Sequence, residues 1–201
     1  MVNLHKNNSV DMSAVKTKAV AVYLGSSEGN SPLFRETVRK FGRSMAEAGI
    51  EVIYGGASVG TMGVLADSVL EAGGNITGVF PTGFGGKREV QAMNVEILQE
   101  GLTQTIFVKD FAERKATMER LADCAVVLPG SYGTMDEMFS YAVNNEIGLH
   151  DKKCYILNIN GYYDGLEIQV ASIKRNGFLK EEADMLRFCH SIDELISKIT
   201  D

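Results

Sequence analysis

The chain has 201 residues, of which 45% are hydrophobic, and a formal net charge of −6. This length suits one well-buried domain, and the acidic balance disfavours nucleic acid or an anionic membrane as a partner, because both require a basic surface. No apolar run reaches transmembrane length, and the first 17 residues lack the apolar core of a signal peptide, so we expect a cytoplasmic protein. The three cysteines and three histidines are scattered, which predicts neither a disulfide framework nor a metal site.

Short apolar runs alternate with helical stretches along most of the chain. Residues 1–17 are polar and predict a loose arm, which leaves 18–201 as a single domain. The predicted strands are 19–24, 51–54, 75–80, 103–108, 124–128 and 154–158. The predicted helices are 32–48, a segment after Gly63 that ends at Gly73, 111–121, a segment after the 130–134 loop that runs to about 147, 163–176 and 191–199. Residues 82–101 break this rhythm, and a loop of that length is a candidate flap over a ligand.

Strands that alternate with helices predict an α/β protein with a doubly wound, Rossmann-like architecture. Its parallel sheet has helices on both faces and right-handed crossovers. Ligands of such sheets bind outside the carboxyl ends of the strands. This rule places four segments at one edge: residues 25–27, 55–63, the start of the 111–121 helix, and 130–134.

The stretch after the fifth predicted strand has the features of a phosphate loop. Gly130 and Gly133 let backbone approach a ligand, and the helix that follows offers free N–H groups and a positive dipole end to an anion. Glu137 is expected in the first turn of that helix, where its carboxylate would lie beside the bound anion. The alternative is that Asp136 and Glu137 only complement the helix dipole.

A second charged group is expected at the same edge. Arg114 and Lys115 lie near the start of the 111–121 helix and form a cation pair that faces the phosphate loop. The alternative is a solvated helix face, on which Glu113 and Glu119 would pair with these cations between turns. Neither glycine loop matches a dinucleotide fingerprint or a Walker A motif, so nicotinamide cofactors and triphosphate hydrolysis are disfavoured.

Several ordered motifs resemble those of the LOG family, the cytokinin riboside 5′-monophosphate phosphoribohydrolases, which is often labelled "lysine decarboxylase". Nothing in the chain resembles a pyridoxal phosphate site. The motifs are Leu128-Pro-Gly-Ser-Tyr-Gly-Thr-Met-Asp-Glu137, Tyr54-Gly-Gly-Ala-Ser-Val-Gly-Thr-Met-Gly63, Gly78-Val-Phe-Pro81, Glu113-Arg-Lys115 with Met118, Gly148-Leu-His-Asp-Lys152 and Asn158-Ile-Asn-Gly-Tyr-Tyr163.

The resemblance implies a homodimeric Rossmann-like enzyme that hydrolyses the N-glycosidic bond of a nucleoside 5′-monophosphate, without a metal or organic cofactor. Arg114 and Glu137 would be the catalytic pair. A carboxylate suits this reaction, because it can stabilise oxocarbenium character on the sugar and activate water. The residues that would bind the phosphate and the rest of the substrate are Gly25, Ser26, Gly56, Lys115, Gly130, Ser131, Gly133 and Thr134.

The chain also departs from the family pattern. Ser131 replaces a glycine, which would cost about 1 kcal/mol if the backbone required a positive φ. The family's Thr-Trp-x-Gln reads Val143-Asn-Asn-Glu146, so the substrate could be AMP as readily as a cytokinin nucleotide. The competing hypothesis is a nonenzymatic nucleotide or molybdenum-cofactor carrier, which predicts a kept phosphate loop and a lost catalytic pair. The presence of Arg114 and Glu137 favours the enzyme.

Overall fold

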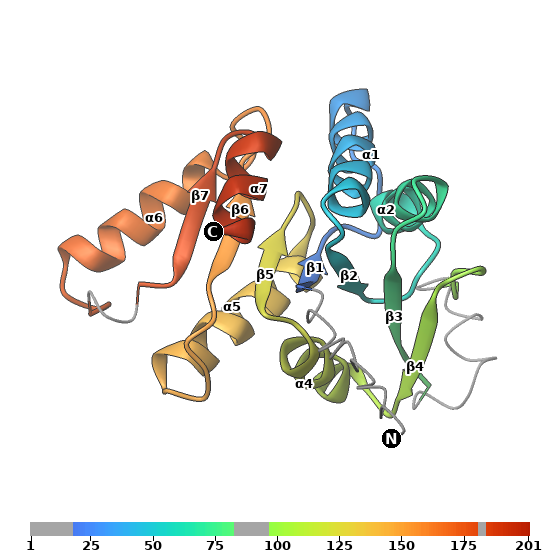
Figure 1. Cartoon of the computed structure of the whole chain (residues 1–201). Helices are drawn as coiled ribbons and strands as arrows, with labels where there is room; N and C mark the ends of the chain where they lie inside the picture. Colours follow the sequence, from blue (N-terminus) through green and yellow to red (C-terminus); the bar gives the residue numbers. More distant parts are fainter. Residues whose placement is uncertain (1–17, 83–96, 181–183) are drawn as a thin grey trace, which may run out of the picture.

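A computed structural model describes residues 18–82, 97–180 and 184–201. The predicted arm at 1–17 and most of the predicted flap at 82–101 lie outside the described residues. Within them, seven parallel strands form one sheet in the order β4-β3-β2-β1-β5-β6-β7, as Figure 1 shows. The predicted α/β, doubly wound fold class is confirmed.

The elements alternate regularly along the chain. The strands are β1 (Ala19–Tyr23), β2 (Glu51–Tyr54), β3 (Ile76–Pro81), β4 (Gln104–Val108), β5 (Cys124–Val127), β6 (Cys154–Leu157) and β7 (Leu186–Cys189). The helices are α1 (Pro32–Glu47), α2 (Gly60–Glu71), α4 (Phe111–Leu121), α5 (Tyr132–Glu146), α6 (Asp164–Arg175) and α7 (Ile192–Thr200). The six predicted strands and six predicted helices are therefore confirmed to within a few residues at their ends.

Two elements differ from the sequence prediction. β7 was not predicted, because its four residues contain Arg187 and so give no continuous apolar run. α2 begins at Gly60, inside the segment predicted as a glycine loop. Gly60 has a φ of +54°, and a Cβ there would lie 2.3 Å from the carbonyl carbon of Ser26. This glycine therefore allows the start of α2 to pack directly on the loop after β1.

The two faces of the sheet carry separate apolar layers. Along β1, Val20 and Val22 pack into one layer with α1, α2 and α7. Ala21 and Tyr23 pack into the other layer with α4, α5 and α6. This alternation follows from the period of two in a strand, and it makes a strand buried on both faces continuously apolar.

The order of the strands creates a crevice between β1 and β5. The chain builds the sheet outward from β1 to β4, and then returns to place β5 on the other side of β1. The loops after β1 and β5 therefore diverge to opposite faces, which is where open α/β sheets bind ligands. A hydrogen bond joins the two loops, since the Gly25 N–H donates to the Pro129 carbonyl at 3.1 Å.

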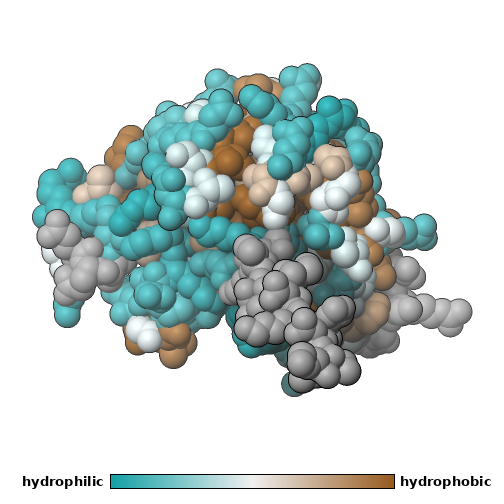
Figure 2. Space-filling model, in the orientation of Figure 1, coloured by the Kyte–Doolittle hydropathy of each residue, from teal (hydrophilic) through white to brown (hydrophobic). Residues whose placement is uncertain are grey.

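The surface in the view of Figure 2 is mostly hydrophilic, with apolar areas scattered over it. One of them lies near the top centre, beside α1, and another lies at the lower left, over the end of α5. Among the described residues, no helix is long and apolar enough to cross a membrane. The three cysteines are buried and free, and burial raises the pKa of the Cys124 thiol to about 12.

Candidate active site

Arg114 is directed inward by the way α4 begins. Asp110 caps the helix by accepting a hydrogen bond from the Glu113 N–H at 2.9 Å, and the Glu113 carboxylate accepts one from the Lys109 N–H at 2.6 Å. Together these two hydrogen bonds fix the first turn. Arg114 follows as the fourth helical residue, and its guanidinium carbon lies 4.6 Å from the centroid of the Phe111 ring. The side chain is 10% exposed.

Glu137 comes from α5, on the same side of the sheet. Ser131 is the N-cap residue and has an extended backbone, so the helix begins at Tyr132 and Glu137 is its sixth residue. The expectation that Glu137 lies in the first turn is therefore wrong. The first turn contains no acidic residue, so neither Asp136 nor Glu137 lies where a carboxylate complements the helix dipole most strongly.

Arg114 and Glu137 form a buried ion pair. The distance between Arg114 Nη2 and Glu137 Oε1 is 3.0 Å, and each side chain is 10% exposed. Gly55 leaves room for the guanidinium, because a Cβ there would lie 3.1 Å from Arg114 Nη1. Below the pair, burial first and the Glu137 charge second raise the pKa of Tyr23 well above its usual value. Tyr23 therefore stays neutral beside this pair.

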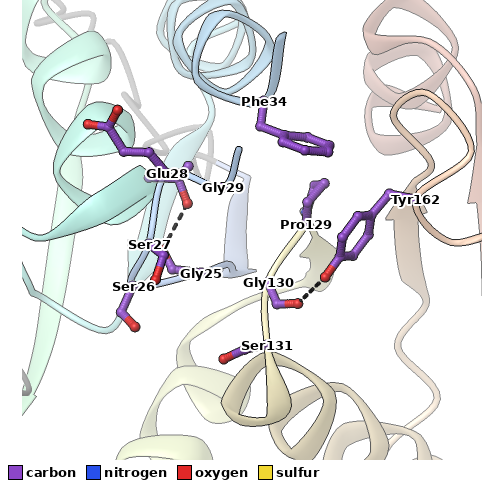
Figure 3. A pocket seen from close by; sticks show the side chains of 11 residues that line it. Gly25, Ser26, Ser27, Glu28, Gly29, Phe34, Pro129, Gly130, Ser131 and Tyr162 are labelled. Carbon is purple, nitrogen blue, oxygen red and sulfur yellow. Dashed lines mark hydrogen bonds between the residues drawn. The ribbon is translucent and has the colours of Figure 1, made fainter. Parts of the chain in front are cut away.

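Three adjoining pockets form a cleft around this pair. The innermost, of about 70 Å³, is lined by Arg114, Glu137 and Thr134 among others. A second, of about 340 Å³, extends outward past Phe111, Lys115 and Asp136. The third, of about 170 Å³, lies between the loops after β1 and β5 (Figure 3). Ser26 lines all three, which makes the cleft continuous.

The structure brings most of the predicted site residues together in this cleft. Those that line at least one of its pockets are Gly25, Ser26, Arg114, Lys115, Gly130, Ser131, Gly133, Thr134 and Glu137. Gly56 does not line the cleft as the described residues form it; its neighbour Gly55 does. Gly56 has a φ of +82° and is buried, and a Cβ on Gly78 would lie 2.9 Å from its Cα. It serves the close packing of β2 and β3.

The phosphate-loop positions have different steric demands. A Cβ on Gly130 would lie 2.0 Å from Thr134 Oγ1 and 2.9 Å from the Gly25 nitrogen, whereas a Cβ on Gly133 would meet nothing within 4 Å. Ser131 has a φ of −101°. A serine at this position therefore carries no free-energy cost of a positive φ, because the backbone at this residue does not enter the left-handed region.

Lys115 links two helices at the rim of the cleft. Its Nζ donates to Asp136 Oδ2 and to Ser140 Oγ, both at 2.8 Å, so it joins α4 to α5. The alternative of a solvated helix face is wrong for Arg114, which is buried. Glu119 accepts a hydrogen bond at 2.7 Å from Asn144 of α5, so this acid also faces the neighbouring helix.

Three aromatic residues of the cleft, Phe34, Phe111 and Tyr162, were not predicted as site residues. Phe34 lies in the first turn of α1 and Tyr162 in the loop after β6, with their rings edge to face and 5.6 Å between centroids. Figure 3 shows both rings at the same end of the pocket. The strand-end rule contains the signal for Tyr162, because the loop after β6 reaches the same sheet edge.

The chain is similar to known proteins over most of its length. A family model described as possible lysine decarboxylase matches residues 62–199. A probable cytokinin riboside 5′-monophosphate phosphoribohydrolase of Oryza sativa subsp. japonica is 36% identical over 163 residues, 81% of this chain and 70% of that protein. The cytokinin riboside 5′-monophosphate phosphoribohydrolase of Rhodococcoides fascians is 35% identical over 162 residues, 81% of this chain and 78% of that protein.

Solved structures with the same fold are more distant in sequence. The molybdenum cofactor binding protein of the phototrophic bacterium Rippkaea orientalis has a TM-score of 0.68 and 17% identity, over 93% of this chain and 98% of that one. At this identity the likeness supports the fold alone.

Proposed function

Because the chain belongs to the family of the cytokinin riboside 5′-monophosphate phosphoribohydrolases, whose family model is described as possible lysine decarboxylase, we propose that it hydrolyses the N-glycosidic bond of a nucleoside 5′-monophosphate. The products would be the free base and ribose 5-phosphate. The observation that carries this proposal is the buried Arg114–Glu137 pair, at 3.0 Å, beside the start of α5.

The phosphate is proposed to bind between the loops after β1 and β5. The first N–H groups of an α-helix have no partner within the helix, and the N-cap of α5 makes no side-chain capping hydrogen bond. These groups and the hydroxyls of Ser26 and Ser131 offer donors to an anion. The ribose would then lie in the innermost pocket, against Glu137, with the base toward Phe111.

The chemistry assigned to the pair follows from its charges. As the bond from C1′ to the base breaks, positive charge develops on the sugar, and the Glu137 carboxylate stabilises it at short range. Glu137 also accepts a proton from the attacking water, whose oxygen bonds to C1′. The departing base takes up one proton from solvent and Glu137 returns one proton to solvent, so that one water molecule is consumed in total. The Arg114 guanidinium fixes the orientation of the carboxylate and balances the charge of the substrate phosphate.

Incubation with AMP and with isopentenyladenosine monophosphate tests the proposal, with free base and ribose 5-phosphate as the measured products. Glu137→Gln preserves shape and removes the charge, so kcat should fall by about 10²- to 10⁴-fold, the usual contribution of a general base. Glu47→Gln makes the same chemical change on an exposed side chain at the far end of α1 and serves as the control. Turnover that survives Glu137→Gln would overturn the mechanism.

The same assay separates the enzyme from a carrier. A nonenzymatic nucleotide or molybdenum-cofactor carrier would bind AMP without releasing base, and its binding would depend on the phosphate loop alone. The kept and buried Arg114–Glu137 pair favours turnover, because a carrier has no use for a desolvated acid beside the sugar. Comparison of AMP with the isopentenyl nucleotide also measures the base preference.

A homodimer is proposed through the outer face of α5. Phe139, Val143 and Ile147 are spaced by four residues and are 44%, 50% and 65% exposed, so they form one apolar stripe on the helix. Leu149 extends the stripe and is 68% exposed, and Figure 2 shows the apolar patch at this end of α5. A second copy of the same stripe fits a two-fold symmetric contact. Val143→Glu should yield a monomer in sedimentation experiments, and an unchanged sedimentation coefficient would contradict this.

The remaining expectations complete the proposal. Residues 18–201 would act as one domain, with 1–17 as an arm. We propose a cytoplasmic location, because three buried free thiols suit a reducing compartment.

A further inference from the structure

Tyr162 makes a contact that the proposed reaction does not use. Its hydroxyl donates to the carbonyl oxygen of Gly130, from the loop after β6 to the loop after β5. The contact spans 32 residues of sequence, and Figure 3 shows it as a bridge across one side of the pocket. The carbonyl that it holds belongs to the peptide between Gly130 and Ser131, at the centre of the proposed phosphate loop.

The orientation of that peptide decides where the Ser131 N–H points. The described peptides are trans, and in a trans peptide the C=O and the following N–H point in opposite directions. With the Gly130 oxygen held toward Tyr162, the Ser131 N–H points to the other side of the loop. Ser26 lies on that side in Figure 3, across the gap from Ser131.

This peptide needs an external partner to fix it. Close packing favours glycine at position 130, since a Cβ would lie 2.0 Å from Thr134 Oγ1 and 2.9 Å from the Gly25 nitrogen. Glycine also leaves the adjoining peptide plane with the greatest rotational freedom. Because Gly130 has no side chain, nothing on this residue restrains rotation of the peptide plane between Gly130 and Ser131. The hydrogen bond from Tyr162 supplies that restraint instead.

The Tyr162 ring is itself held by neighbours. Phe34 lies edge to face with it at 5.6 Å between centroids, and Tyr163 does so at 4.9 Å. A Cβ on Gly29 would lie 2.9 Å from the Phe34 ring, so Phe34 packs closely on the loop after β1. The position of the hydroxyl is therefore set by α1 and by the adjacent tyrosine, although Tyr162 is 44% exposed.

We infer that Tyr162 is a positioning residue, which holds the Gly130–Ser131 peptide in the orientation that presents the Ser131 N–H to the 5′-phosphate of the substrate. The inference rests on the proposed binding of the phosphate at this loop. In this role Tyr162 affects how tightly the phosphate binds and has no part in breaking the glycosidic bond.

The test compares AMP with adenosine, which differ only in the phosphate, by titration calorimetry on wild type and Tyr162→Phe. Loss of one hydrogen bond lowers the population of the binding-competent peptide, and the apparent Kd rises in proportion, by about three- to tenfold. We expect that rise for AMP and less than about a twofold change for adenosine. The kcat of the variant with saturating AMP should stay near that of wild type.

Tyr163→Phe is the matched control. Tyr163 also donates its hydroxyl to a backbone carbonyl of the same segment, that of Leu128 at 2.8 Å, but it is fully buried and its bond lies outside the loop. The Tyr163→Phe substitution should lower the unfolding temperature and leave the ratio of AMP affinity to adenosine affinity unchanged. Phe34→Leu keeps the Tyr162 hydroxyl but loosens the packing of the Tyr162 ring. It should weaken AMP binding by a smaller factor than Tyr162→Phe does.

Equal changes for AMP and adenosine in Tyr162→Phe, an unchanged AMP affinity, or the same phosphate-specific loss in Tyr163→Phe would overturn the inference. If the variants change the affinities for AMP and adenosine as expected but the wild type releases no base from AMP, the proposed hydrolysis is overturned. The role of Tyr162 in binding the phosphate would then still stand.

Discussion

Replacement of Arg114 by methionine should destabilise the fold through the carboxylate that it leaves behind. Both side chains of the Arg114–Glu137 pair are 10% exposed and their closest atoms are 3.0 Å apart. Opposite charges about 4 Å apart, at an effective dielectric constant near 20, attract by about 4 kcal/mol. Removal of one partner of such a pair costs about 3–5 kcal/mol, because the other charge stays desolvated. In a protein of this size that loss lowers Tm by roughly 10 °C.

The second substitution, Glu137→Gln, should restore part of the stability that Arg114→Met removes, because the amide carries no charge. Urea unfolding of wild type, both single variants and the double variant at pH 7 gives a coupling free energy. We expect about 2 kcal/mol, within the range of residues in contact. If the losses of unfolding free energy in the two single variants add up to the loss in the double variant within about 0.5 kcal/mol, the two residues are not a coupled pair. Activity should be lost in all three variants, which separates the role in catalysis from the role in stability.

Two further predictions concern the free energy of unfolding. Gly130→Ala should lower the free energy of unfolding by about 1–3 kcal/mol through overpacking against Thr134. Gly133→Ala has open space for its Cβ and should leave this free energy within about 1 kcal/mol of wild type. Equal urea midpoints for the two variants would contradict this. Burial lowers the pKa of His150 from its usual 6.5, so the unfolded chain binds more protons below that pH. The stability that His150 contributes is therefore present above about pH 6.5 and is lost as the pH falls below it, and His150→Gln should show a smaller decline in urea midpoint over this range than wild type.

The sequence was sufficient for the architecture because buried strands and glycine-punctuated helices leave direct patterns. Continuous apolar runs predicted β1 and β5, and the strand-end rule predicted that Gly25, Arg114 and Gly130 lie at one edge of the sheet. β7 was missed because it lies at the border of the sheet, pairs only with β6 among the described strands, and contains Arg187. A short edge strand needs no continuous apolar pattern.

Contacts within the site were harder to predict because they depend on how each helix starts. Glu137 was expected in the first turn of its helix, but the extended backbone of Ser131 starts α5 at Tyr132 and moves Glu137 into the second turn. That shift of a few residues turns its carboxylate toward Arg114, 23 residues away in sequence. Likewise, nothing in the local sequence states that Tyr162 reaches Gly130, because the hydrogen bond depends on the placement of β6 next to β5.

The departures from the family pattern fall into two physical groups. Ser131 lies inside the phosphate loop but keeps an extended backbone, so its side chain adds a hydroxyl without strain. Val143 and Glu146 are exposed on α5, and neither lines the cleft that the described residues form. A change at Val143 alters the apolar stripe proposed for the second copy and leaves the Arg114–Glu137 pair untouched. The surface proposed for the dimer can therefore vary while the groups assigned to bond cleavage stay the same, because the former lies on the outer face of α5 and the latter on its buried face.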